Sequence, residues 1–207
     1  MEDTMKKGAK IGLGCLGIII IVVLILGSKS CGTYNTLIAR EEAVKTEWGE
    51  VENQYQRRTD LIPNLVATVK GFAAQEKEVF QSVVEERAKV GSIQVGPEIL
   101  NNPAAFQQFQ QAQSGLSSAL SRLLLVVERY PELKSDQNFL ELQSQLEGTE
   151  NRIAVARKRF NEAAQSYNTY IKQFPNNIFA GIFQFQPKEY FQAEPGSEEA
   201  PVVDFTQ

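Results

Sequence analysis

The clearest pattern in the sequence is a stripe of mostly apolar residues in the segment 139–174. Its members are spaced alternately three and four residues apart: Phe139, Leu142, Leu146, Thr149, Ile153, Ala156, Phe160, Ala163, Tyr167, Tyr170 and Phe174. This spacing keeps them on one side of an α-helix, and no proline interrupts the segment before Pro175. At about 1.5 Å per residue the helix would be about 55 Å long, and it needs partner helices to cover its stripe.

A second stripe of apolar residues begins at Leu37 and passes through Pro63. It continues in one three-four register as Val44, Trp48, Val51, Tyr55, Ile62, Leu65, Val69, Phe72, Val79, Val83 and Val90. A proline inside a helix removes a backbone hydrogen bond and clashes with the carbonyl four residues before it. Because the register does not slip at Pro63, we predict one helix over about residues 33–90 that kinks near Asp60. A break into two helices, with Asp60 as a cap, is the alternative.

A third, shorter stripe lies in residues 104–130, after a connection rich in glycine, asparagine and proline. Its apolar members are Phe106, Phe109, Leu116, Leu120, Leu123, Val127 and Tyr130, and the outer faces carry Gln107, Gln108, Gln110 and Gln111. We interpret the glutamine-rich faces as solvated helix surface. Pro131 ends this helix or begins the next, and Ser135 or Asp136 can cap the long helix that follows.

These stripes predict an all-α fold for residues 33–191, an elongated antiparallel bundle of three to four long helices. The three helices would measure about 85, 40 and 60 Å, so the second is too short to cover both others. Either the first helix folds back at Pro63 and gives four helices of more equal length, or neighbouring copies cover the remaining stripe. We therefore expect coiled-coil-like packing and a homo-oligomer.

An uncharged segment, residues 11–28, precedes the predicted bundle. About 20 apolar residues span a bilayer, with about 17 near the lower limit, so we predict an N-terminal transmembrane helix here, with the lipid bilayer as its partner. Lys6, Lys7 and Lys10 favour a cytoplasmic segment 1–10 and a bundle outside the cytoplasm. A cleaved signal peptide, cut ahead of Cys31, and a buried soluble helix are the alternatives.

The C-terminal part combines an aromatic segment with an acidic one. Residues 174–191 are dense in phenylalanine and tyrosine, and we expect them to pack onto the end of the bundle or, alternatively, into a groove of a partner. Residues 192–207 are acidic and contain proline and glycine. We predict a disordered acidic tail there.

Composition weighs against catalysis. The 207 residues carry a formal charge of −4 with a pI near 5.1, which does not suggest a nucleic-acid-binding protein. The chain has no histidine, the commonest general base and metal ligand, and its two cysteines, Cys15 and Cys31, lie in or beside the first apolar segment. We therefore expect no enzymatic activity, no metal and no cofactor.

Three charged residues interrupt the register of the first long helix: Arg58, Glu76 and Glu86. Burying a charge costs several kcal/mol unless it is paired, so these residues indicate a structural polar layer. Glu147 and Glu150 on the last long helix are the candidates for the opposing side. We hypothesise that Arg58 pairs with one of these two carboxylates across the bundle.

A cluster of charged residues, Arg57, Arg58 and Asp60, lies within one turn of Pro63. Proline frees backbone carbonyl and amide groups in a helix, arginine can donate to the carbonyls, and aspartate can accept from the amides. The cluster can therefore satisfy the kink. The functional alternative is a site for an anion or a lipid headgroup, made by the two arginines.

Several sequence segments resemble the LemA family. They are RRTDLIPNLV at 57–66, VKGF at 69–72, ERYPELK at 128–134 and LEGTENRIA at 146–154, followed by Arg157, Phe160–Asn161, Tyr167–Asn168 and Phe174–Pro175. The resemblance implies a bacterial membrane protein with one N-terminal span and a helical bundle, and it implies no activity. Genes of the family often lie near those for membrane proteases and quality-control proteins, which makes such a protein a possible partner. Where the family often has a His-Glu pair, this chain has Gln75 and Glu76.

We therefore expect a single-pass protein of the bacterial inner membrane whose extracytoplasmic bundle is a non-enzymatic scaffold or interaction module that self-associates. The alternative is a lipid-contacting protein of the envelope, which would touch headgroups through its aromatic segment or through Arg57 and Arg58. An enzyme that uses Asp60, Glu76 and Glu150 would require a pocket in which these acids converge.

Overall fold

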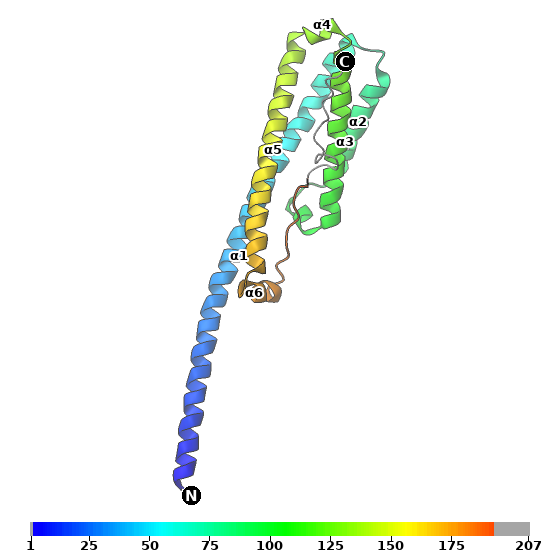
Figure 1. Cartoon of the computed structure of the whole chain (residues 1–207). Coiled ribbons are helices and arrows are strands. Elements are labelled where there is room, and N and C mark those ends of the chain that lie inside the picture. Colours follow the sequence, from blue (N-terminus) through cyan, green and yellow to red (C-terminus); the bar gives the residue numbers. More distant parts are fainter. Residues whose placement is uncertain (1, 193–207) are drawn as a thin grey trace, which may run out of the picture. The chain divides into compact units, whose positions relative to one another are not determined.

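The computed structural model describes residues 2–192, with side chains from residue 31 onward. The described part of the chain is helical and has no strand, in agreement with the predicted all-α class. In chain order the elements are α1 (Glu2–Phe72), α2 (Lys77–Ser92), the 3-10 helix η1 (Pro97–Asn101), α3 (Pro103–Val127), α4 (Pro131–Lys134), α5 (Gln137–Lys172) and α6 (Asn176–Ile182) (Figure 1).

The chain divides into two compact units. Unit 1 comprises residues 1–43 and 165–187, and unit 2 comprises residues 44–164 and 188–207. In unit 2 the chain runs along α1, returns along α2, runs back along α3 and returns along α5 (Figure 1). Unit 2 is thus an antiparallel arrangement of four helical segments.

The predicted fold class included a transmembrane helix, and this part of the prediction is wrong. Within the described part of the chain, no helix combines the length and the apolar character that crossing a membrane requires. Residues 11–28 form part of the 71-residue helix α1, and their side chains lie outside the described residues. Beyond residue 31, charged residues such as Arg40, Glu41 and Lys45 alternate with the apolar positions of α1, which is the pattern of a bundle helix.

The other predicted terminal segments fall largely outside what the structure describes. The side chains of residues 1–10 lie outside the described residues, and so do residues 193–207 of the predicted acidic tail. Gln192 is therefore the last residue of the chain whose position is described.

The predicted helix over residues 33–90 is also wrong, because the chain turns at Ala73–Glu76. Pro63 lies inside α1 and does not end it. Because proline has no N–H, it cannot bond the carbonyl of Thr59, four residues before it. This carbonyl accepts a hydrogen bond from Arg87 instead. The turn spans four residues, close to one helical repeat. The three-four spacing of apolar residues therefore continues across the turn, and the sequence pattern conceals the break. The buried residues next to the turn are Ala73 and Phe80, whereas the predicted Phe72 is 40% exposed and Val79 is partly buried.

Local hydrogen bonds explain where the later helices begin. The side chain of Asn102 accepts a hydrogen bond from the backbone N–H of Ala105 at 3.1 Å, and Pro103 follows it at the first helical position of α3. Asp136 accepts from the backbone N–H of Phe139 at 2.9 Å and so caps α5, one of the two capping positions predicted.

The core of unit 2 is built mostly from the predicted stripes, to which Ala73, Phe80, Ala119, Val126 and Leu133 are added. Its buried apolar cluster contains Ile62, Leu65, Val69, Ala73, Phe80, Val83, Val90, Leu116, Ala119, Leu120, Leu123, Val126, Val127, Leu133, Phe139 and Leu146. Because α2 folds back and packs against α3, the stripe of the first predicted helix is buried within the chain from Val44 to Val69. The expectation that a monomer leaves long parts of the stripes bare is therefore wrong for the described residues of unit 2.

Unit 1 has a smaller core around the C-terminal part of α5. Leu37, Tyr167 and Ile171 are buried there, and the Tyr34 ring meets the ring of Phe183 edge-on, with 4.8 Å between the centroids. Part of the aromatic segment 174–191 thus packs within its own chain, as one of the two alternatives expected, whereas Phe174, Ile178 and Ile182 of the same segment are exposed.

Candidate functional site

A buried arginine lies in the interior of unit 2. Arg58 lies on α1 and is 1% exposed, so its charge is shielded from water. It occupies the apolar register of α1, between Tyr55 and Ile62, which are also buried. The helix therefore directs a cation into the bundle at this position, and such a cation requires partners.

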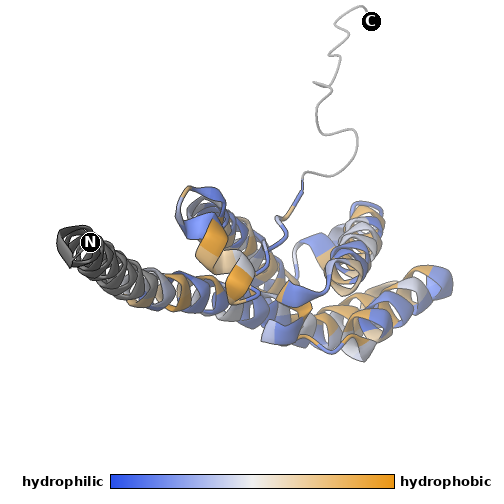
Figure 2. Cartoon of the chain, turned by 90° about the horizontal axis from the view of Figure 1, so that it is seen from below, coloured by the Kyte–Doolittle hydropathy of each residue, from blue (hydrophilic) through white to orange (hydrophobic). Residues whose placement is uncertain are grey.

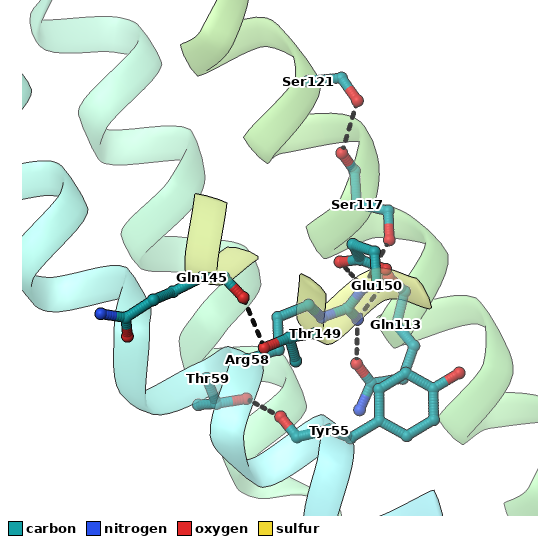
Figure 3. Close-up of polar contacts among 9 residues, drawn as sticks. All are labelled: Tyr55, Arg58, Thr59, Gln113, Ser117, Ser121, Gln145, Thr149 and Glu150. Atoms are coloured by element: carbon teal, nitrogen blue, oxygen red, sulfur yellow. Dashed lines mark hydrogen bonds and ion pairs between the residues drawn. The ribbon is translucent and has the colours of Figure 1, made fainter. Parts of the chain in front are cut away.

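Residues from α3 and α5 supply these partners (Figure 3). Nη1 of Arg58 donates to Oγ of Ser117 at 2.8 Å and to Oε1 of Glu150 at 2.9 Å. Nη2 donates to the backbone oxygen of Gln113 at 3.3 Å and also to its side-chain oxygen. The Arg58 guanidinium carbon lies 5.1 Å from the centre of the Tyr55 ring. Arg58 thus links three helices through neutral oxygens, one carboxylate and one aromatic ring.

A cavity of about 290 Å³ opens beside this cluster, and we call it the Arg58 cavity. Its lining residues come from α1, α3, α5 and the end of the described chain: Tyr55, Arg58, Gln107, Gln110, Gln111, Gln113, Ser114, Ser117, Glu150, Ile153, Arg157, Phe191 and Gln192. The charged members are two arginines and one glutamate, so the lining has a net charge of +1. Among the described residues, Nε of Arg58 has no hydrogen-bond partner.

The last described residues, 188–192, form one wall of this region, and we call them the strap. Asn161 donates to the backbone oxygen of Phe191 at 3.0 Å and accepts from its N–H at 2.9 Å. Arg157 donates to the backbone oxygen of Gln192 at 3.0 Å, and the N–H of Gln192 donates to Oε1 of Gln110 at 3.2 Å. Side chains of α3 and α5 therefore bind the backbone N–H and the backbone carbonyl of two consecutive residues, Phe191 and Gln192.

An aromatic cluster anchors the strap. The Phe191 ring is 7% exposed and lies 5.1 Å from the Phe106 ring, 5.5 Å from the Phe160 ring and 6.1 Å from the Trp48 ring, measured between centroids. The Arg157 guanidinium covers the Phe191 ring at 4.8 Å. Aromatic pairs at these separations stabilise beyond the area they bury, so Phe191 holds the strap against the cavity.

Burial also changes the acid–base behaviour of Tyr55. Removal of its phenol from water raises the pKa of Tyr55, and the nearby positive charges of Arg157 and Arg58 offset part of this effect. The phenol therefore stays neutral at ordinary pH and can both donate and accept a hydrogen bond in the cavity.

The structure brings together only part of the predicted polar layer. Arg58 and Glu150 form the ion pair described above. Glu147 is exposed and accepts from Gln143 at 2.9 Å. Arg57 and Asp60 are exposed as well, and Asp60 accepts from the Gln56 side chain at 2.8 Å.

Glu76 belongs to a separate cluster beside the turn between α1 and α2. It accepts from the Tyr130 hydroxyl at 3.1 Å and pairs with Arg129 at 3.1 Å, and Gln75 donates to the same hydroxyl at 2.7 Å. Of the acids Asp60, Glu76 and Glu150, only Glu150 lines the Arg58 cavity.

Sequence reasoning missed several residues of the site. Gln113, Ser117 and Gln110 lie on α3, where the glutamines were interpreted as solvated surface, although the short spacing of Gln113 from the apolar Leu116 places it near the buried face. Arg157 and Asn161 belong to the family-like segments, but no pattern in the sequence indicated that they bind the C-terminal residues. Among residues 31–192, no group of three or more His, Cys, Asp or Glu side chains is placed to hold a metal ion.

Comparison with known proteins relates most of the chain to one family. The family model described as "LemA family" matches residues 47–205. The chain is 30% identical over 186 residues to "Magnetosome protein MamQ 2" of Paramagnetospirillum magneticum, covering 82% of this chain and 68% of that protein. It is 29% identical over 189 residues to "Magnetosome protein MamQ" of Magnetospirillum gryphiswaldense, with the same coverage. "Protein LemA" of Metamycoplasma hominis is 21% identical over 196 residues, covering 93% of this chain and 85% of that protein.

Proposed function

Because the chain belongs to the LemA family, we propose that it is a non-enzymatic helical scaffold at a bacterial membrane that binds other copies of itself. Two of the relatives are named as magnetosome proteins, and such a name gives a place in the cell and no reaction. The bonding of Arg58 supports a structural use of its charge, because four acceptors on neighbouring helices, one of them a carboxylate oxygen, already occupy its two terminal nitrogens.

The observation that carries the proposal is an exposed apolar surface in unit 1. Phe174 is 81% exposed, Ile178 51%, Ile182 65% and Phe183 41%. Three of these residues follow one another at four-residue intervals into the short helix α6, whose sequence NNIFAGI is largely apolar (Figure 2). We call these four residues the α6 surface. Clustered apolar residues that face water mark association sites.

Two other large exposed apolar residues, both in unit 2, do not share this clustering in sequence. Val84 on α2 and Leu125 on α3 are 56% and 68% exposed, and neither has another large exposed apolar residue within four positions of it in the sequence. Single exposed apolar residues are normal on a folded protein. They therefore provide a matched control for the α6 surface.

The proposal is tested by the mass of the full chain, purified in mild detergent and measured by size exclusion with light scattering. We expect the wild type to be an oligomer, the double variant Ile178→Glu with Ile182→Glu to shift toward the monomer, and the control Val84→Glu with Leu125→Glu to keep the wild-type mass. A wild type that is monomeric at every concentration contradicts the proposal.

A second candidate function is contact with a lipid surface through the same residues. The aromatic character of Phe174, Phe183 and Tyr34, which is 39% exposed, favours it, because aromatic side chains are enriched at membrane–water interfaces. Flotation with vesicles of neutral and anionic phospholipids separates the two functions. Loss of vesicle binding in the Ile178→Glu, Ile182→Glu variant, without a change in oligomer mass, would favour the lipid.

A further inference from the structure

The Arg58 cavity has room for a small molecule while the strap stays in place. Phe191 and Gln192 of the strap form one of its walls, so its volume of about 290 Å³ is the space that the strap leaves open. Small-molecule sites in proteins typically have volumes of about 300–1,000 Å³, and this cavity lies at the lower end. At about 30 Å³ for each molecule of liquid water, it has the volume of about ten waters. A ligand of a few heavy atoms therefore fits without displacing any part of the chain.

The lining of the cavity carries more positive than negative charge. Glu150 compensates one guanidinium, since its Oε1 lies 2.9 Å from Nη1 of Arg58. The described contacts of Arg157 are a backbone oxygen, a phenol and an aromatic ring, and none of these carries a negative charge. A charge in a partly enclosed site acts on a ligand more strongly than one in open water, because the local dielectric is lower. The cavity therefore favours an anion.

The Tyr55 phenol provides a hydrogen-bond donor in this positive field. Arg157 donates a hydrogen bond to the phenol, and burial raises the pKa of Tyr55, so the phenol keeps its proton at ordinary pH. A hydroxyl that accepts one bond can still donate its own O–H. A bond accepted from a cation polarises this O–H and strengthens the bond that it donates. Tyr55 is therefore suited to bind a negatively charged oxygen.

Arg58 adds a buried positive charge whose bonding is incomplete. Four acceptors occupy its two terminal nitrogens, but its Nε has no partner among the described residues. The side chain is almost fully buried and lines the cavity. A negative charge in the cavity would stabilise this guanidinium without breaking any of its bonds. A neutral ligand would give no such stabilisation.

Apolar groups form another part of the cavity wall. Ile153 and the Phe191 ring line it, and both belong to residues that are largely buried. At the mouth, the exposed residues Gln107 and Gln111 carry uncharged amides. The cavity thus offers a short apolar surface beside the charged groups, which suits a ligand with a hydrocarbon part as well as an anionic part.

We propose that the Arg58 cavity binds a small organic monocarboxylate, with its carboxylate toward the Tyr55 phenol and its hydrocarbon part toward Ile153 and Phe191. One negative charge balances the net charge of +1 of the lining, whereas a phosphate group carries about −1.5 to −2 near neutral pH. The ligand leaves the bonds of Arg157 to the strap and to Tyr55 in place. Arg157 acts on it through its charge and through the phenol.

This inference goes beyond the proposed function and does not rest on it. The cavity belongs to unit 2, whereas the α6 surface belongs to unit 1. Ligand binding and oligomer mass are separate measurements on the same purified protein. Failure of one therefore leaves the other standing.

The test is isothermal titration calorimetry of the full chain in mild detergent, at constant ionic strength and in a buffer without carboxylate or phosphate. The probes are butyrate and benzoate, and their neutral controls of nearly the same shape are butyramide and benzamide. We expect at least one carboxylate to bind with a Kd of about 1 mM or less, as a ligand of so few atoms can. Its amide should bind at least about tenfold more weakly, because hydrogen bonds to a charged group are roughly twice as strong as neutral ones.

The Tyr55→Phe variant removes only the hydroxyl that the carboxylate would meet. We expect it to bind the carboxylate about tenfold more weakly than the wild type, since a charge-assisted bond is lost. Tyr130→Phe is the matched control. The Tyr130 phenol donates to Glu76 and lies outside the lining of the cavity, so this variant should bind as the wild type does.

A second pair of variants tests the location of the site independently. Gln111→Trp places a large ring at the mouth of the cavity, on an exposed residue that makes no contact with Arg58 in the described structure. It should abolish binding. Gln108→Trp makes the same change at an exposed residue of α3 that lies outside the lining, and it should leave the Kd unchanged. Circular dichroism verifies that all four variants are folded.

The proposal is supported if a carboxylate binds more tightly than its amide, and if Tyr55→Phe and Gln111→Trp lose this binding while their controls keep it. It is overturned if neither carboxylate binds or if the amides bind equally well. It is also overturned if either Tyr55→Phe or Gln111→Trp binds like the wild type. Inorganic phosphate is the competing anion, and tighter binding of phosphate than of both carboxylates would overturn the assignment as well.

Discussion

Arg87 donates a hydrogen bond from Nε to the backbone oxygen of Thr59, with 3.3 Å between the two atoms. This oxygen is the acceptor that Pro63 cannot bond, since proline has no N–H. A side chain of α2 thus replaces the missing helical donor of α1, and the contact joins the two helices at the point where the sequence suggested a kink or a break. The proline is accommodated by α2, not by the nearby Arg57 and Asp60.

A double-mutant cycle tests this relationship. We expect Arg87→Ala to lower the free energy of unfolding by about 1 kcal/mol in the wild type, because it leaves the Thr59 carbonyl without a donor. In the Pro63→Ala background the alanine N–H can bond that carbonyl, so the same change should cost only a few tenths of a kcal/mol. Urea unfolding followed by circular dichroism measures all four chains, and equal costs in both backgrounds would refute the relationship.

The ion pair of Arg58 makes Glu150 important for stability although its side chain is 42% exposed. Glu150→Ala should cost about 2 kcal/mol, because it leaves a buried guanidinium short of its carboxylate. Adding Arg58→Met should recover part of that loss, since the uncompensated charge is then removed. Thermal and urea unfolding check both variants. A double variant less stable than Glu150→Ala would show that the other contacts of Arg58 outweigh its desolvation.

Asn161 holds the strap through two hydrogen bonds to Phe191. In Asn161→Ala we expect amide hydrogens of residues 188–192 to exchange faster with solvent, and the global stability to fall by about 1–2 kcal/mol. Asn151→Ala is the matched control, because Asn151 is exposed on the same helix. Hydrogen exchange measured by mass spectrometry tests this. Equal exchange rates of residues 188–192 in Asn161→Ala and the wild type would contradict the role of Asn161 in anchoring the strap.

Two tyrosines make the stability depend on pH in the alkaline range. Burial raises the pKa of Tyr55, and burial, with the negative charge of Glu41 adding to it, raises the pKa of Tyr167. Above the ordinary tyrosine pKa of about 10 the unfolded chain loses these protons while the folded chain keeps them. Stability is therefore unaffected below about pH 10 and falls as the pH rises further. Tyr55→Phe and Tyr167→Phe should each flatten this fall in urea titrations at successive pH values. A fall of unchanged slope in both variants would count against the burial of these phenols.

The sequence patterns predicted the helices and most of the core, because a three-four stripe specifies both the element and its buried face. Phe106, Leu116, Ile153 and Phe160 all lie in predicted stripes and are buried. The patterns could not reveal the turn at Ala73–Glu76, since the three-four spacing of apolar residues continues across it. They also overestimated the bare surface, because the length comparison treated α1 and α2 as one helix.

Only the charged residues of the candidate site could be predicted from the sequence. A charged residue in an apolar register made Arg58 conspicuous, and helical spacing indicated that Glu150 could face it. The neutral partners Gln113 and Ser117, and the strap contacts of Arg157 and Asn161, depend on how segments distant in sequence meet. Neither hydropathy nor residue type predicts which distant segments come into contact.

The central claim, that the chain binds further copies of itself through the α6 surface, is tested most directly by co-purification of two differently tagged full-length copies expressed together. The account predicts that capture of one tag recovers the other, and that Ile178→Glu with Ile182→Glu in both copies abolishes the recovery while Val84→Glu with Leu125→Glu preserves it. Recovery of the captured copy alone from wild-type cells, or equal recovery with the α6 variant, would contradict it.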